Sequence, residues 1–212
     1  MKKFFVCAFF LFFISPVYAQ NYEYKASTVD EIEIYVNEGV LNISPAQTKD
    51  IKVEIAADSP ADMTGHIMID PDRELKMFFD RAGLGADAVI NITVPSSKNK
   101  IEIKSANAFI NLSDVKGSLN IDAANGKVNV KNFSGDFEVN TAQAGVSAEG
   151  IFKELDIETA SGTVSVQMRK IPALYDYSVE GTGAVEFKLP AGFVKAKLKI
   201  DRKDFSGNLN IR

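Results

Sequence analysis

The fold is decided by residues 101–168, which read IEIKSANAFINLSDVKGSLNIDAANGKVNVKNFSGDFEVNTAQAGVSAEGIFKELDIETASGTVSVQM. This stretch holds four consecutive copies of an 18-residue unit. The copies begin at Ile101, Leu119, Phe137 and Leu155. A second apolar position recurs at the same spacing, at Ile110, Val128, Val146 and Val164. Because a fixed period of this length is typical of stacked-repeat proteins, we interpret the rest of the chain from this unit.

Each unit alternates apolar and polar residues in two short runs, separated by corners of small residues. Alternation with a period of two indicates strands with one buried face. The polar positions follow the same 18-residue period, at Glu102, Asn120, Glu138 and Asp156 and at Asn111, Asn129, Ser147 and Ser165. In a meander of hairpins the residue class has no reason to be constant at this spacing, whereas in a solenoid each residue lies over its equivalent in the next coil. The sequence therefore predicts an all-β, single-domain parallel β-helix, or β-solenoid, with coils of about 18- to 19-residue length.

The repeat extends beyond its regular middle, residues 99–168. A 19-residue spacing separates Ile32 from Ile51, which predicts a slightly longer coil near the N-terminus. Residues 58–88 depart from the pattern and are expected to form an irregular insert. After an interruption at 169–176 the alternation resumes, which predicts C-terminal coils over 174–212. No segment after the N-terminal apolar run has a sustained 3.6-residue period, so almost no helix is expected.

The N-terminus has the features of a secretory signal peptide. Lys2 and Lys3 precede an apolar run from Phe4 to Ile14, and small residues lead to an expected cleavage site after Ala19. Residues 1–19 are therefore set apart from the β-solenoid domain, residues 20–212, in which no transmembrane segment is expected. Export to the periplasm, the cell surface or the medium follows from this interpretation.

Charge and cysteine content narrow the classes of function. Residues 20–212 contain 22 basic and 28 acidic residues, a net charge of −6, and a mildly acidic chain lacks the basic surface that nucleic acid requires. The single cysteine, Cys7, lies in the signal segment. Neither a disulfide nor a thiolate metal site is expected in the domain.

Two stretches resemble a known family. The runs from Gly117 to Val130 and from Glu158 to Val166 are similar to the β-strand repeats of the bacterial putative-adhesin family of unknown function, and Ile92-Thr93-Val94-Pro95 is similar to the lead-in to those repeats. The head domain of putative auto-transporter adhesins is a second resemblance. Both imply an exported, non-enzymatic β-helix that binds a partner or serves a structural role.

An enzyme that acts on polysaccharides is the alternative function. The acids Glu102, Glu138, Asp156 and Glu158 are expected on the outward face, and paired carboxylates perform acid–base catalysis in such enzymes. Here they are spread over regular columns that also hold Asn. His66 is the only histidine, so neither a Ser-His-Asp triad nor a histidine metal cluster can be assembled. No catalytic residue and no cofactor is therefore assigned.

The insert offers a candidate calcium site and a candidate partner contact. Carboxylates that suit a hard cation gather there, at Asp70, Asp72, Glu74, Asp80 and Asp87, although a solvated turn also explains them and no metal is assigned. Phe78, Phe79 and Leu84 are candidate partner contacts, with packing under the first coils as the alternative. The expected partner is a cell-envelope protein or glycan, or a second copy of the chain paired through the terminal strand at Asn208–Arg212.

Overall fold

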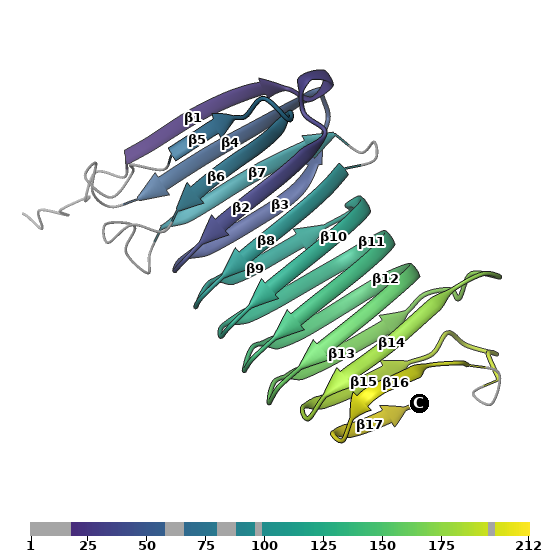
Figure 1. Ribbon diagram of the computed structural model, residues 1–212. Helices are drawn as coiled ribbons and strands as arrows, with labels where there is room; N and C mark the ends of the chain where they lie inside the picture. Colours follow the sequence, from purple (N-terminus) through teal and green to yellow (C-terminus); the bar gives the residue numbers. More distant parts are fainter. Residues whose placement is uncertain (1–17, 58–65, 80–87, 96–98, 195–197) are drawn as a thin grey trace, which may run out of the picture.

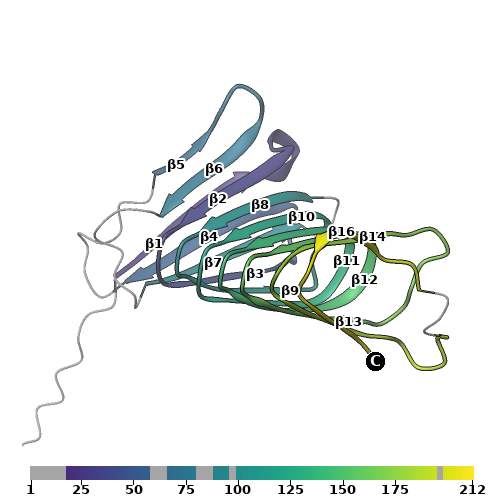
Figure 2. The same cartoon turned by 60° about the horizontal axis from the view of Figure 1, so that its bottom comes forward.

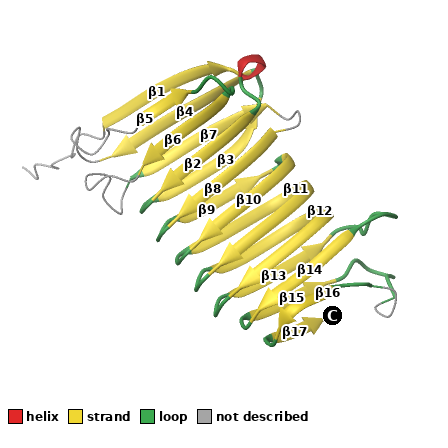
Figure 3. Ribbon diagram, in the orientation of Figure 1, coloured by secondary structure: helices red, strands yellow, loops and turns green. Residues whose placement is uncertain are grey.

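The computed structural model describes residues 18–57, 66–79, 88–95, 99–194 and 198–212. Over these residues most of the chain is strand, as the alternating pattern predicts, and its one helical segment is the short 3-10 turn Ala26–Thr28 (Figure 3). The strands stack along one axis, from the N-terminal strands at one end to β17 at the other (Figure 1). The predicted β-solenoid is confirmed.

The solenoid is built from two parallel sheets, which we call sheet A and sheet B. Sheet A contains, in stacking order, β6 (Glu74–Phe79), β2 (Glu31–Val36), β8 (Asn99–Ser105), β10 (Lys116–Ala123), the second halves of β11 (Lys127–Thr141) and β12 (Gly145–Thr159), β14 (Asp176–Gly181) and β16 (Asp201–Phe205). Sheet B contains β7 (Val89–Pro95), β3 (Val40–Ala46), β9 (Phe109–Ser113), the first halves of β11 and β12, β13 (Thr163–Met168), β15 (Ala184–Lys188) and β17 (Asn208–Ile211). Seen nearly end-on, the coils are flattened loops with the two sheets opposed (Figure 2).

Between the sheets lies a continuous apolar core. In the regular strands every second residue points inward. The 18-residue spacing places equivalent residues side by side, so Leu119 pairs with Ile101 on one side and with Phe137 on the other. These side chains are at most 1 % exposed. A single coil has too few apolar side chains to offset the entropy of ordering its backbone, so the coils are stable only as a stack.

The corners between strands depend on small residues because neighbouring backbones approach closely. Gly135 has a φ of +145°, and a Cβ at this position would lie 1.9 Å from the carbonyl oxygen of Gly117. The equivalent position one coil later is Lys153, which lacks a glycine's freedom. There the register shifts, since Gly135 pairs with Phe152 while Asp136 pairs with Glu154, which leaves Lys153 bulged out of the ladder.

The order of stacking differs from the order of the sequence at the N-terminal end. Ile32 of β2 pairs with Leu75 of β6 and with Ile101 of β8. The coil formed by β2 and β3 therefore lies between the β6–β7 coil, which comes later in the chain, and the regular coils that begin at β8.

The 19-residue spacing from Ile32 to Ile51 is therefore not a stacking repeat, and that prediction is wrong. Ile51 belongs to β4 (Asp50–Ala57), which pairs antiparallel with β7 in sheet B. Parallel and antiparallel strands share the same alternation, so the pattern does not encode which strand lies beside which. Within the insert expected to be irregular, the described residues 66–79 form the hairpin of β5 (His66–Ile69) and β6, and β6 is a regular rung of sheet A.

Antiparallel strands cover the N-terminal end of the stack. β1 (Tyr18–Lys25) pairs with β4 at the edge of sheet B, and β5 pairs with β6 at the edge of sheet A. Tyr22 and Tyr24 of β1 pack partly buried against the core. Cleavage after Ala19 would leave Gln20–Lys25 of this strand. At the other end, β17 pairs with β15 and has no further strand neighbour in the part of the chain that the structure describes.

Candidate functional site

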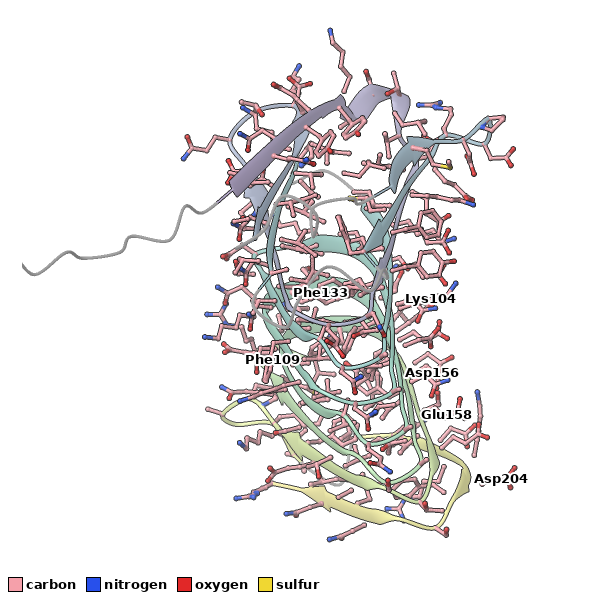
Figure 4. The ribbon with its side chains drawn as sticks, turned by 90° about the vertical axis from the view of Figure 1, so that its left-hand side faces the viewer. Lys104, Phe109, Phe133, Asp156, Glu158 and Asp204 are labelled. Carbon is pink, nitrogen blue, oxygen red and sulfur yellow. The ribbon has the colours of Figure 1, made fainter. Side chains whose placement is uncertain are left out.

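Two outward surfaces differ sharply in charge. We call the outward side of sheet A from β10 to β14 the acidic face. It carries Asp122, Asp136, Glu138, Glu154, Asp156, Glu158, Asp176 and Glu180. We call the outward side of sheet B from β7 through β3 and β9 to the first half of β11 the amide face, after its column of asparagines. Figure 4 shows Phe109 of the amide face on the opposite side of the coils from Asp156 and Glu158, with Phe133 of the core between them.

On the acidic face, carboxylates on neighbouring rungs repel one another. Burial, together with the charges of Asp156 and Asp122, raises the pKa of Glu138. The pKa of Asp122 is raised by burial and by the charge of Glu102. Asp156 is bonded within the face, since the Ser178 hydroxyl donates to its Oδ1 at 2.6 Å. Partial burial and like charge thus disfavour the charged forms of Glu138 and Asp122.

Beside the acidic face, sheet A carries an aromatic and lysine cluster. The rings of Tyr35 and Phe78 stack at 4.8 Å with an interplanar angle of 10°, and Lys104 Nζ lies 5.0 Å from the Tyr35 centroid. That ammonium also donates to Glu102 at 2.7 Å, to Glu33 at 3.1 Å and to the Tyr35 hydroxyl at 3.3 Å. These contacts raise the pKa of Lys104, so this amine remains charged at neutral pH. The Lys104 ammonium thus has three hydrogen-bonding partners on sheet A.

The three candidate partner contacts of the sequence have different environments. Phe78 is half-buried in the stack with Tyr35. Phe79 is only 1 % exposed and belongs to the core, so it cannot contact a partner. Adjacent residues of a strand point to opposite faces, and for this pair the inward position falls on Phe79. Leu84 lies outside the described residues.

A shallow groove of about 560 Å³ adjoins the aromatic and lysine cluster where the strands of sheet A end. Tyr35 and Lys104 line one part of it, and Asp122 and Asn140 line another. Alanines of the corners form much of the rest: Ala106, Ala123, Ala124 and Ala142. The Tyr35 ring is already engaged by Phe78 from β6 and by Lys104 from β8, the two strands that flank β2.

The amide face is organised by a hydrogen-bonded asparagine column. Asn42 Nδ2 donates to Asn91 Oδ1 at 2.9 Å, and Asn111 Nδ2 donates to Asn42 Oδ1 at 3.0 Å. Asn129 Nδ2 continues the chain to Asn111 Oδ1 at 3.0 Å. The four amides come from β7, β3, β9 and β11, and each is half-buried. A groove of about 380 Å³ runs beside them, lined by Asn42, Ser44, Asn111, Ser113, Asn129 and Lys131, with Ile43 and Leu112.

The sequence identifies only part of this column. Asn111 and Asn129 are recognisable as equivalents at the 18-residue spacing. Asn42 and Asn91 stand out only as members of Asn-x-Ser/Thr triplets, because their neighbours in the column are 49 and 69 residues away in the chain. A further triplet residue, Asn132, lies in a corner with a φ of +54° and donates to Asp114 Oδ1 at 3.0 Å. Only the out-of-sequence stacking brings the four amides together.

The carboxylates that suggest a calcium site form a turn where the structure describes them. Asp70 Oδ1 accepts the backbone N–H groups of Asp72 and Glu74 at 3.0 and 3.1 Å. Its other oxygen is 3.1 Å from Lys76 Nζ. Asp80 and Asp87 lie outside the described residues. Over the described ranges, no three His, Cys, Asp or Glu side chains are grouped so as to hold a metal ion.

Several solved structures are similar to this chain along most of its length, among them one from Parabacteroides merdae and one from Clostridium sporogenes. A putative adhesin from Parabacteroides merdae ATCC 43184 aligns with a TM-score of 0.51 and 15 % identity, covering 92 % of this chain and 96 % of its own. A putative cell adhesion protein from Clostridium sporogenes ATCC 15579 aligns with a TM-score of 0.48 and 14 % identity, covering 93 % and 100 %. Because the Parabacteroides merdae protein is only 15 % identical to this chain, the similarity shows a shared fold and nothing more.

No curated protein matches the chain. Where the structure describes the chain, no helix has the length and apolar character needed to cross a membrane. The family model described as Toastrack DUF4097 matches residues 29–211, which is most of the chain. The protein therefore belongs to the Toastrack family, as the resemblance to the putative-adhesin repeats led us to expect.

Proposed function

We propose that the protein is an exported, non-enzymatic binding protein of the cell envelope or surface, whose flat outward faces engage a component of the envelope. The observation that carries this proposal is the regular display of polar groups on the parallel ladders. Parallel rungs about 4.8 Å apart hold equivalent side chains in straight columns, and many of their hydrogen-bonding groups face solvent. Recognition on such a scaffold loses little conformational entropy when a partner binds.

Two further points support export and binding. The basic, apolar and small-residue order of residues 1–19 is that of a secretory signal. The Parabacteroides merdae protein, which shares the fold, is described as a putative adhesin, and adhesion is a binding role at a surface. Together these points favour a binding role outside the cytoplasm.

Cell fractionation tests export, and co-sedimentation tests binding. We expect the full-length chain to reach the periplasm, surface or medium, and a variant that lacks residues 2–19 to remain in the cytoplasm. The exported protein should then sediment with washed envelopes of its own bacterium. Cytoplasmic retention of the full-length chain, or exported protein that does not sediment, would refute the proposal.

One observation favours the polysaccharide-active alternative. Glu138, with its raised pKa, lies beside Asp156 on the next rung, and glycosidases use two carboxylates of different pKa. The groove that we describe on sheet A is lined by Asp122 and Asn140 rather than by this pair. A panel of polysaccharides incubated with the protein decides the question. Products that form with the wild type and disappear in both Glu138→Gln and Asp156→Asn would establish the enzyme.

A further inference from the structure

The amide face combines three parallel columns of different chemistry. The middle column holds the four bonded asparagines. An apolar column lies on one side of it, formed by Val89, Val40 and Phe109. A hydroxyl column lies on the other, formed by Thr93, Ser44 and Ser113 on the same three strands. Successive outward residues of a strand are two positions apart, so the columns are separated by roughly 7 Å.

The polar columns retain unused hydrogen-bonding capacity. A carboxamide has two N–H donors and two acceptor lone pairs. Asn42, in the middle of the column, uses one donor toward Asn91 and one lone pair toward Asn111. The other donor and lone pair remain for solvent or a ligand. The hydroxyls of Ser44 and Ser113 have no bonding partner among the residues that the structure describes, and both line the groove of about 380 Å³.

The apolar column offers a ring surface. Phe109 is 54 % exposed, although residues of its size are usually covered. Its strand neighbour on the same face is Asn111, so an aromatic ring and a hydrogen-bonding amide lie next to each other. A flat ligand with an apolar face and polar edges would use both.

Charge excludes several kinds of partner from this part of the surface. The outward residues of β7, β3 and β9 include no acidic or basic side chain. The nearest charges lie on the two flanking strands. Lys127 and Lys131 of β11 pair with Phe109 and Ser113. On the other side, Glu54 and Lys52 of β4 pair with Asn91 and Thr93. The acidic face on the opposite side carries eight carboxylates. An anionic polymer would gain nothing from β7, β3 and β9, and a cationic one would bind the acidic face instead.

We infer that the amide face binds a linear, uncharged polysaccharide. Sugar hydroxyls would exchange hydrogen bonds with the free edges of the asparagine column and with Ser44 and Ser113, and one sugar ring would pack against Phe109. The rungs from β7 through β3 to β9 suit a repeating ligand, because an apolar, an amide and a hydroxyl side chain recur on each of these strands. This inference rests on the proposed function and names the envelope component as a neutral glycan.

The test is calorimetric titration of the exported protein with neutral hexasaccharides, namely cellohexaose, mannohexaose, laminarihexaose and maltohexaose, with polygalacturonate as the charged comparison. We expect at least one neutral hexasaccharide to bind and polygalacturonate not to bind. The variants Phe109→Ala and Ser44→Ala/Ser113→Ala should each weaken binding about tenfold or more, the effect of losing roughly 1.4 kcal/mol of contact. Because these side chains are exposed or carry no internal hydrogen bond, thermal unfolding should be unchanged.

Two matched control variants show whether a loss of binding is specific to the amide face. Ser118→Ala on sheet A and Ser165→Ala further along sheet B remove hydroxyls outside the amide face, and both should bind like the wild type. The inference is overturned if none of the four neutral hexasaccharides binds at millimolar concentration. It is also overturned if Phe109→Ala and Ser44→Ala/Ser113→Ala bind a hexasaccharide as tightly as the wild type does. If envelope co-sedimentation persists in those variants, the proposed function stands and the amide face is the wrong site. If the exported wild type does not sediment with envelopes, the proposed function itself fails.

Discussion

Replacing Val128 with aspartate should unfold the solenoid. Val128 lies in the first half of β11, is 0 % exposed and is stacked between Ile110 and Val146 of the neighbouring rungs. The change removes an apolar side chain whose burial contributes about 1.5–3 kcal/mol. It also forces the new carboxyl to become neutral in order to stay inside, which at pH 7 costs about 4 kcal/mol for a group with an ordinary pKa near 3.9.

The combined cost, about 6 kcal/mol, is comparable to the whole stability of a typical domain, about 5–15 kcal/mol. Expulsion of the aspartate would relieve the charge but break the parallel rungs on both sides. We therefore expect Val128→Asp to be unfolded, or to melt many degrees below the wild type, when ellipticity is followed during heating.

The neighbouring residue provides the control. Asn129→Asp places the same carboxylate on the outward side, where it loses the hydrogen bond from Asn129 Nδ2 to Asn111. One such bond is worth about 0.5–1.5 kcal/mol, which corresponds to a few degrees in the melting temperature. Equal melting temperatures for the two variants would refute the assignment of inward and outward positions.

Three further changes test the corners, the asparagine column and the acidic face. Gly135→Ala should destabilise strongly because its Cβ would meet Gly117, whereas Gly145→Ala, with nothing within 4 Å of its Cβ, should melt like the wild type or slightly higher. Asn111→Leu should cost about 1–3 kcal/mol in denaturant unfolding, since it breaks two bonds of the column, while Ser118→Ala should cost nothing measurable. Glu138→Gln should raise the melting temperature at pH 7. The folded-state pKa of Glu138 is raised, so its charged form destabilises above that pKa, and the gain should vanish as pH falls through it.

The regular middle of the fold could be predicted from the sequence, because there each ladder partner lies one 18-residue period away in the chain. Leu119 identifies Ile101 and Phe137 as its neighbours in this way. The N-terminal end could not, since β2 has the same alternation whether its neighbour is β4 or β8. The packing of whole coils decides which strand lies beside β2, and it pairs Ile32 with Leu75 and with Ile101. Neither local propensity nor spacing carries that information.

The candidate site is hidden from the sequence for the same reason. Phe109 and Asn111 belong to a regular coil, and the alternation predicts that this aromatic ring and this amide lie on the same face of one strand. Their ladder partners Val40 and Asn42 belong to the β2–β3 coil. The 19-residue spacing from Ile32 to Ile51 predicts β4, not β9, as the next strand beside that coil. Phe78, a candidate contact from the sequence, stacks on Tyr35 within sheet A, on the other side of the solenoid from the amide face.

The amide face exists only if the β2–β3 coil lies directly against the β8–β9 coil, so this placement is the claim to test first. In a Cys7→Ser background, Glu33→Cys/Glu102→Cys places thiols on paired residues of β2 and β8. Adjacent parallel strands are about 4.8 Å apart, within the Cα separation that a disulfide spans. Glu33→Cys/Lys52→Cys is the matched alternative, at the 19-residue spacing. Mild oxidation followed by peptide mass mapping should show the 33–102 disulfide and not the 33–52 disulfide, and the reverse result would contradict the stacking order on which the proposed glycan site depends.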